Sequence, residues 1–288
     1  MINYLLLFVV IFGVNLQTIF NKQFYLNNPD TKENFIYQYN FFTLLSACVF
    51  LGIIYAFNFN FCLETLIYAS FFAITFCLCI FSVYQALATG PMSLTVLISS
   101  FSTILPLLFG VAFLKEKLTF LGILGLIVLA LSLILVNKVK KGEKINKKWL
   151  FYITIAFISN GGNSIIQKLH QASVGGDYTI CFQFIAMIIA VIITGALMLV
   201  KEKPNFPTFF KNSGALNSSL AGIANAIVNI TMLYLAVNMK AVILYPVVSA
   251  GGLVISFLTA LIIYRERLNK LQYLGSLLGL ISILLLNL

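Results

Sequence analysis

Charged residues are scarce in this sequence. Only 9% of its 288 residues are charged and 61% are hydrophobic, whereas a soluble domain averages about 25% charged residues. So few charges cannot cover a water-exposed surface, and the mean hydropathy of +1.02 indicates that lipid is the main solvent. We therefore expect a multi-pass integral protein of the plasma membrane, in contact with membrane lipid.

Acidic residues are the rarest charges. The sequence has 8 Asp and Glu against 18 Lys and Arg, and none of the acidic residues lies near the centre of a long apolar run. A carboxylate inside the membrane is what a proton-coupled cation exporter would use to exchange protons for cations, so that mechanism is disfavoured. The basic residues lie in short connectors, which indicates topology signals and argues against nucleic acid as a partner.

Residues suited to metal binding and catalysis are also few. The single histidine, His170, lacks an intramembrane carboxylate to work with, and Cys77 and Cys79 would point about 200° apart on a helix. We therefore expect no metal site, no cofactor and no enzymatic activity, because a membrane enzyme acting on lipid would need a convergent acid, base or metal cluster. A non-transporting sensor would need a soluble output domain, and the connectors are too short for one.

Long apolar runs are what the sequence has in abundance. Each run approaches the roughly 20 residues that a helix needs to cross a bilayer. The runs are continuous rather than alternating, which favours helices over barrel strands. We expect helices near residues 2–21, 35–57, 65–88, 92–114, 119–137, 148–170, 178–200, 214–237, 241–264 and 270–287, joined by loops.

An internal repeat organises these helices. A shift of 150 positions aligns residues 84–137 with residues 234–287 without a gap, and it places Lys115-Glu-Lys-Leu118 on Arg265-Glu-Arg-Leu268. Each copy holds five expected helices, an odd number, so the second copy must enter the membrane from the opposite side. Inverted repeats of this kind are typical of transporters with alternating access.

The repeat defines the expected architecture. We predict an all-α integral membrane protein with ten transmembrane helices, arranged as two inverted five-helix repeats around a central cavity. The first repeat covers residues 1–138, a basic connector covers 139–147, and the second repeat covers 148–288.

Several segments of the chain carry a pattern of glycines, prolines and charged residues. They are Tyr84-Gln-Ala-Leu-Ala-Thr-Gly-Pro-Met-Ser93, Pro106, Lys115-Glu-Lys-Leu118, Gly125, Gly161-Gly-Asn-Ser-Ile-Ile-Gln-Lys168 and Gly13-Val-Asn15. These segments resemble the EamA-type transporters of the drug/metabolite transporter superfamily. In the second copy Lys168 follows Gly161 by seven residues. In the first copy the corresponding lysine after Gly13 is displaced to Lys22. The resemblance implies ten helices around a central cavity, and transport of amino acids, sugars, nucleotide-linked metabolites or drugs.

Polar side chains within the apolar runs are the candidate binding residues, because a polar group in the membrane costs free energy unless it is paired or lines a wet cavity. Asn160, Asn163, Ser164 and Gln167 follow the spacing of one helical face, and we expect this face to line the cavity. For a single Asn, hydrogen bonding between helices is an equally good interpretation. The candidate cavity residues are Asn15, Gln17, Ser99, Thr103, Asn160, Asn163, Gln167, Lys168, Asn225, Asn229, Tyr245 and Ser249.

The few charged or titratable groups near helix ends have two interpretations. Lys168 and His170 either attract an anionic group of the substrate or extend to the lipid headgroups, and the second role is favoured for His170. Glu116 and Glu266 are each flanked by basic residues, so we expect them to form salt bridges and turn caps.

These features predict a secondary transporter that moves a small neutral or zwitterionic metabolite, with an amino acid as the leading candidate. Export of drugs or other metabolites is the alternative, since the 27 phenylalanines would suit apolar ligands. The expected partner is a small-molecule solute, and the expected assembly is a monomer or homodimer. Basic connectors would place both termini outside the cell, whereas the family resemblance implies cytoplasmic termini.

Overall fold

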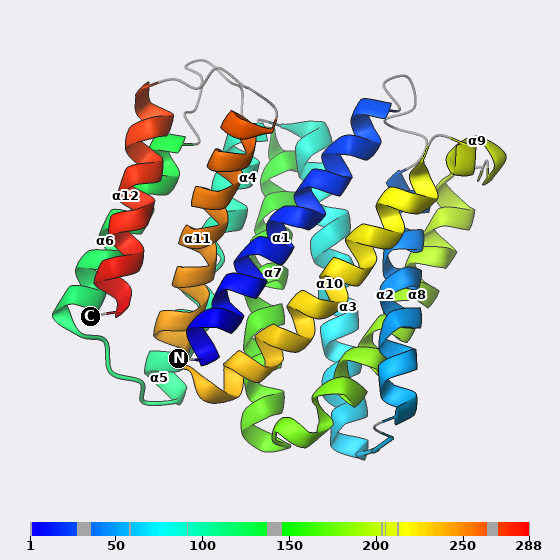
Figure 1. Ribbon diagram of the computed structural model, residues 1–288, viewed down its shortest axis with the longest axis horizontal. Coiled ribbons are helices and arrows are strands. Elements are labelled where there is room, and N and C mark those ends of the chain that lie inside the picture. Colours follow the sequence, from blue (N-terminus) through cyan, green and yellow to red (C-terminus); the bar gives the residue numbers. More distant parts are fainter. Residues whose placement is uncertain are drawn as a thin grey trace. The chain divides into compact units, whose positions relative to one another are not determined.

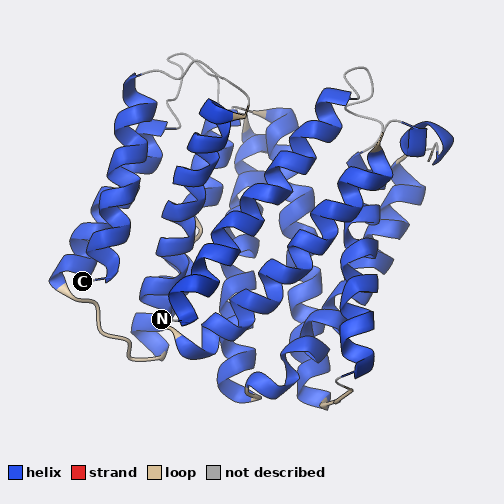
Figure 2. Cartoon of the chain, in the orientation of Figure 1, coloured by secondary structure: helices blue, strands red, loops and turns tan. Residues whose placement is uncertain are grey.

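The computed structural model describes residues 2–27, 36–57, 59–90, 92–136, 146–202, 204, 206–211, 213–263 and 270–287. Within these ranges the regular structure is helical and contains no strand (Figure 2). The elements are α1 (Ile2–Asn27), α2 (Ile36–Phe57), α3 (Leu63–Thr89), α4 (Met92–Phe101), α5 (Ile104–Phe113), α6 (Phe120–Val136), α7 (Lys147–Ser173), the 3-10 helix η2 (Gly176–Tyr178), α8 (Thr179–Lys201), α9 (Phe206–Lys211), α10 (Gly214–Asn238), α11 (Ala241–Ile262) and α12 (Lys270–Asn287). The prediction of an all-α protein is confirmed.

The length of the apolar helices and the apolar side chains on their surface are those of a membrane protein. Among the described residues, five helical stretches are long and apolar enough to cross a membrane, namely Ile2–Phe24, Ile36–Phe57, Leu63–Leu87, Gly176–Lys201 and Gly214–Asn238. Large apolar side chains such as Phe8, Leu131 and Ile192 are exposed along the helices. An exposed apolar surface of this extent needs lipid around it, so the chain is an integral membrane protein.

One predicted helix is divided in the structure. The segment expected as a single helix over 92–114 consists of α4 and α5, which are separated by Ser102 and Thr103. Pro106 has no N–H to give to the Ser102 carbonyl, and its ring crowds that oxygen. The side chains of Ser102 and Thr103 donate to the carbonyls of Ser99 and Ser100 at 2.6 and 3.1 Å, which competes further with the helical pattern.

The stretch expected as a loop between Lys201 and Asn212 contains the short helix α9. Phe209 of α9 is fully buried, and its ring stacks on Phe42 at a centroid distance of 5.0 Å and packs on Phe24 at 5.9 Å. Pro207 lies in the first turn of α9, where a missing N–H costs nothing. Aromatic packing therefore holds a short helix in a segment that the sequence predicted to be a loop.

The chain divides into two compact units, each of which mixes residues from both predicted repeats. Unit 1 comprises residues 78–169 and 235–288, and unit 2 comprises residues 2–77 and 170–234. The division falls within α3, α7 and α10.

In unit 1 the helices that the sequence repeat relates lie side by side. α6 packs on α12 (Figure 1), and Ser132 donates to the Gly275 carbonyl at 2.6 Å while Gly125 lies against Leu286. Gly125, early in α6, meets Leu286, late in α12, whereas Ser132, late in α6, meets Gly275, early in α12. The two helices therefore run antiparallel. α5 also packs on α11, with Gly110 beside Ala241 at the start of α11.

In unit 2, α2 packs on α8. The hydroxyl of Tyr55, near the end of α2, lies 3.6 Å from Cys181 Sγ, near the start of α8. At the opposite end, Glu202 accepts hydrogen bonds from the backbone N–H groups of Tyr37 and Gln38. These contacts make α2 and α8 an antiparallel pair, and they place the Glu202 carboxylate on the N-terminus of α2.

Candidate functional site

The gap between α4 and α5 is held by a side chain from α7. Asn160 Nδ2 donates to Ser102 Oγ at 2.7 Å and to the Ser99 carbonyl at 3.3 Å. Gly161 allows this approach, because a Cβ at that position would lie 2.9 Å from the Ser102 carbonyl oxygen. Ser99 Oγ is buried and has no hydrogen-bond partner within the described part of the chain. The structure thus brings the candidate residues Asn160 and Ser99 into contact. The candidate Thr103 follows Ser102, the other residue that Asn160 contacts.

A second contact joins α7 to α11. The hydroxyl of Tyr245 donates to the Ser164 carbonyl at 2.8 Å, and the Tyr245 ring is buried. Ser249 lies one turn further along α11 and is partly buried. Tyr245 therefore fastens two helices together, and its hydroxyl is engaged by the protein in this conformation.

The third contact involves Lys168. Its ammonium group donates to the carbonyls of Ala236 and Met239 at 2.7 and 2.6 Å and lies 3.6 Å from the Glu116 carboxylate. The three N–H bonds of the ammonium group thus have three protein acceptors. Lys168 does not extend to the headgroups, and its predicted contact with a substrate stays a prediction.

Glu116 has the role expected for it. Its carboxylate pairs with Lys168 and accepts the backbone N–H of Val242 at 3.0 Å, in the first turn of α11. The prediction of a salt bridge and helix cap is therefore confirmed for Glu116. Its repeat partner, Glu266, lies outside the described residues.

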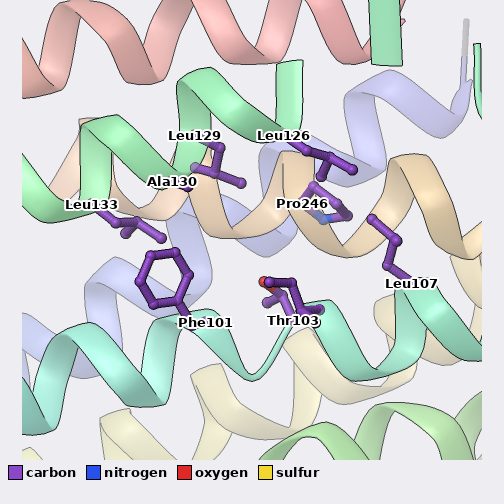
Figure 3. A pocket seen from close by; sticks show the side chains of 9 residues that line it. Phe101, Thr103, Leu107, Leu126, Leu129, Ala130, Leu133 and Pro246 are labelled. Carbon is purple, nitrogen blue, oxygen red and sulfur yellow. The ribbon is translucent and has the colours of Figure 1, made fainter. Parts of the chain in front are cut away.

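A small cavity lies beside the gap between α4 and α5 (Figure 3). Its volume is about 40 Å³, and the lining residues are Phe101, Thr103, Ile104, Leu107, Leu126, Leu129, Ala130, Leu133 and Pro246. Thr103 is the one candidate site residue in this lining, and its hydroxyl donates to the Ser100 carbonyl. The space holds one or two water molecules at most, so it is too small for a metabolite in this conformation.

Two further candidates, Asn163 and Gln167, lie on the same helix in unit 1. Both side chains are buried, at positions three and seven residues beyond Asn160 on α7. Their assignment to a solute cavity stays a prediction. Together with the contacts of Asn160, Ser164 and Lys168, they make the predicted polar face of α7 a buried face of the protein.

The other four candidates belong to unit 2, where three of them form a network. Asn225 Nδ2 donates to Gln17 Oε1 at 3.1 Å, and Asn229 Nδ2 donates to Asn225 Oδ1 at 3.1 Å. This network joins α1 to α10. Asn15 is buried and donates to the Ile11 carbonyl one turn earlier in α1 at 2.8 Å.

The single histidine lies in a buried network that was not predicted from the sequence. His170 is 0% exposed, so the expectation that it reaches the headgroups is wrong. Its Nε2 lies 3.1 Å from Thr65 Oγ1, its Nδ1 accepts from Gln171 Nε2 at 3.4 Å, and its ring packs on Phe182 at 4.4 Å. Because Gln171 Nε2 only donates, Nδ1 is the acceptor and Nε2 carries the ring proton. Aromatic and hydroxyl partners on other helices cause this burial, and local sequence does not show them.

Comparison with family models finds one match, in the second part of the chain. The lipid-facing helices and the paired polar groups inside them define a polytopic membrane protein. Residues 147–288 match the model of the EamA-like transporter family, which confirms over this segment the resemblance to the drug/metabolite transporter superfamily. The match indicates a membrane transporter of the drug/metabolite transporter type.

Solved structures agree on the fold. One crystal structure superimposes with a TM-score of 0.76 and 14% sequence identity, over 98% of this chain and 95% of the other. At this identity the likeness shows the fold alone. No curated protein matches the chain.

Proposed function

We propose that this protein is a secondary transporter that moves a small neutral or zwitterionic metabolite across the membrane by alternating access. The observation that carries the proposal is the gap between α4 and α5. Interrupted helices inside a membrane protein expose backbone groups, and these are tolerated where they are held by protein or line a solute path. Asn160 holds this gap from α7, on the helix face that the sequence analysis assigned to the cavity.

The proposed architecture has ten membrane crossings in two inverted repeats. The interrupted pair α4 and α5 counts as one crossing, and the other nine are α1, α2, α3, α6, α7, α8, α10, α11 and α12. An inverted repeat places related helices antiparallel. The antiparallel packing of α6 on α12 supports this arrangement, because these two helices are related by the 150-residue shift.

The chemistry of the candidate residues supports a solute without net charge. The predicted set consists mainly of amides and hydroxyls, which both donate and accept hydrogen bonds. Its single charged member, Lys168, is paired with Glu116. An amino acid is the leading candidate, because its ammonium and carboxylate groups would use both kinds of partner.

Export of an apolar drug is the second candidate. The apolar lining of the cavity beside Thr103 favours it, since a larger version of that cavity would accept hydrocarbon. The two candidates differ in which solutes stabilise the protein. A ligand that binds the folded state raises its melting temperature, so a thermal-shift screen with both amino acids and apolar amines separates them.

The proposal is tested by uptake into proteoliposomes with variants of α7. Asn160→Ala removes the side chain that bridges the gap, and Asn163→Ala and Gln167→Ala remove the other two amides of the predicted face. Thr154→Ala is the matched control, because Thr154 is an exposed residue of the same helix. The three amide variants should lose at least tenfold in uptake while Thr154→Ala keeps it. Unchanged uptake by folded amide variants would show that the site is wrong.

A further inference from the structure

Gln183 is a fully buried side chain whose hydrogen-bonding groups are unused. It lies in α8, is 0% exposed, and neither Nε2 nor Oε1 has a hydrogen-bond partner among the residues that the structure describes. The surrounding stretch of α8, from Ile180 to Ile193, is otherwise apolar. A polar group inside the membrane is costly and points to function unless the protein pairs it.

The neighbourhood of Gln183 in unit 2 contains a second unused group. Thr179 and Gln183 are one helical turn apart on α8 and therefore share a face. Gln171 Nε2 donates to Thr179 Oγ1 at 3.1 Å and to His170 Nδ1 at 3.4 Å. Gln171 Oε1, by contrast, is buried without a partner in the described ranges. Two carbonyl oxygens and one amide nitrogen therefore lie unused near the start of α8.

Packing does not account for the amide of Gln183. Leucine has a similar volume and would fill the same space without leaving two donor and two acceptor positions unpaired. The polar groups of the network that includes Thr179, namely those of Thr65, His170 and Thr179 itself, are already paired with one another or with backbone. The amide of Gln183 lowers stability in this conformation, so its benefit must come from a ligand or from another conformation.

We propose that Gln183 and Gln171 form a subsite for a small zwitterionic solute. This inference rests on the proposed function, because the subsite is sealed in this conformation and alternating access would open it. The amide nitrogen of Gln183 would donate to the carboxylate of the solute, and the carbonyl oxygens of Gln171 and Gln183 would accept from its ammonium group. A simple amine or a simple acid would use only part of this set.

A matched pair of variants tests the subsite. Gln38, in the first turn of α2, is also 0% exposed with both amide atoms unpaired among the described residues, and it lies at the opposite end of the α2 and α8 pair. Gln183→Leu and Gln38→Leu each remove one unpaired buried amide. Both should raise the melting temperature of the solute-free protein by about 2–4 °C.

The two variants should differ with solute present. Neutral amino acids, with their amine and carboxylic acid analogues, serve as probes in thermal-shift and proteoliposome uptake assays. Gln38→Leu should keep the solute-dependent shift and the uptake of the wild type, whereas Gln183→Leu should raise the half-saturating concentration at least tenfold. Gln183→Glu, which adds a carboxylate of nearly the same shape, should shift the preference toward the amine analogue.

Each outcome decides one claim. Uptake by Gln183→Leu equal to that of the wild type overturns the subsite and leaves the proposed function standing. A lower melting temperature for solute-free Gln183→Leu and for the unbranched Gln183→Met also overturns it, because the amide is then part of the folded structure. If wild type and Gln38→Leu neither bind nor transport any zwitterion, the proposed function fails and the subsite fails with it.

Discussion

The ammonium group of Lys168 lies 3.6 Å from the carboxylate of Glu116, and each side chain is 10% exposed. Lys168 also donates to carbonyls at the C-terminal end of α10, and Glu116 accepts an N–H at the N-terminal end of α11. A cation at a helix C-terminus and an anion at a helix N-terminus are both favourable. The pair therefore fastens both ends of the turn between α10 and α11.

Removing one member of this pair should be more harmful than removing both. Lys168→Met leaves the Glu116 carboxylate buried without its cation, and we expect a loss of about 3–5 kcal/mol in the free energy of unfolding. The double variant with Glu116→Gln should recover part of that loss. Thermal or denaturant unfolding in detergent measures both effects, with Lys148→Met at an exposed position of α7 as the control. A double variant no more stable than Lys168→Met would contradict the pairing.

Glu202 should stabilise the start of α2. Its carboxylate accepts the N–H groups of Tyr37 and Gln38 at 2.7 and 2.9 Å, which is the role of a helix N-cap. Glu202→Ala should cost about 0.5–2 kcal/mol in the free energy of unfolding. Glu64→Ala, at an exposed position in the first turn of α3, should change it much less, and equal losses would argue against the cap.

The effect of Glu202 should depend on pH. Burial raises the pKa of Glu202 above its ordinary value, against the opposing effect of the backbone hydrogen bonds that its carboxylate accepts. The folded chain then holds the proton more tightly than the unfolded chain. The stability of wild type relative to Glu202→Ala should therefore rise as pH falls through the raised pKa, and the gain should be complete below the unfolded value of about 4.3. A difference that shrinks as pH falls would contradict the sign.

The gap between α4 and α5 should lower the stability of the protein and should be needed for transport. Pro106→Ala restores an N–H that can bond the Ser102 carbonyl and so favours one continuous helix. We expect a higher melting temperature and slower uptake. Pro207→Ala, in the first turn of α9, should leave uptake unchanged. Uptake by Pro106→Ala at the wild-type rate would show that the gap has no role in transport.

Close packing of α6 on α12 should make Gly125 sensitive to substitution. A Cβ at Gly125 would lie 2.9 Å from Leu286 Cγ and 3.1 Å from the Leu286 backbone nitrogen. Gly125→Val should therefore lower the free energy of unfolding by about 1–3 kcal/mol. Gly162→Ala is the control, since a Cβ there meets nothing within 4 Å. A neutral Gly125→Val would show that the two helices are further apart.

The sequence was informative wherever a signal is local or periodic. Continuous apolar runs predicted most of the helices within a few residues, and the ungapped register of residues 84–137 on 234–287 relates the two helices that pack as α6 and α12. The spacing of Asn160, Asn163 and Gln167 predicted a shared polar face of α7, and all three side chains lie at least partly buried.

Features that depend on distant partners could not be read from the sequence. Lys168 and Glu116 are 52 residues apart, and their pairing depends on how α7 meets the turn after α5. A proline inside a helix is not enough to predict a gap, because α11 continues through Pro246 whereas α4 ends before Pro106. Gln183 was overlooked because a single amide in an apolar run is unremarkable until its burial and lack of partners are known.

Counterflow in proteoliposomes tests the central claim most directly. Vesicles that contain the purified protein are loaded with an unlabelled neutral amino acid and diluted into a trace of the labelled compound. A carrier with alternating access exchanges the two, so the label should accumulate transiently inside the vesicles, and Asn160→Ala should reduce the accumulation at least tenfold. Label no higher than in protein-free vesicles, for each zwitterion that stabilises the protein in thermal-shift assays, would contradict the account.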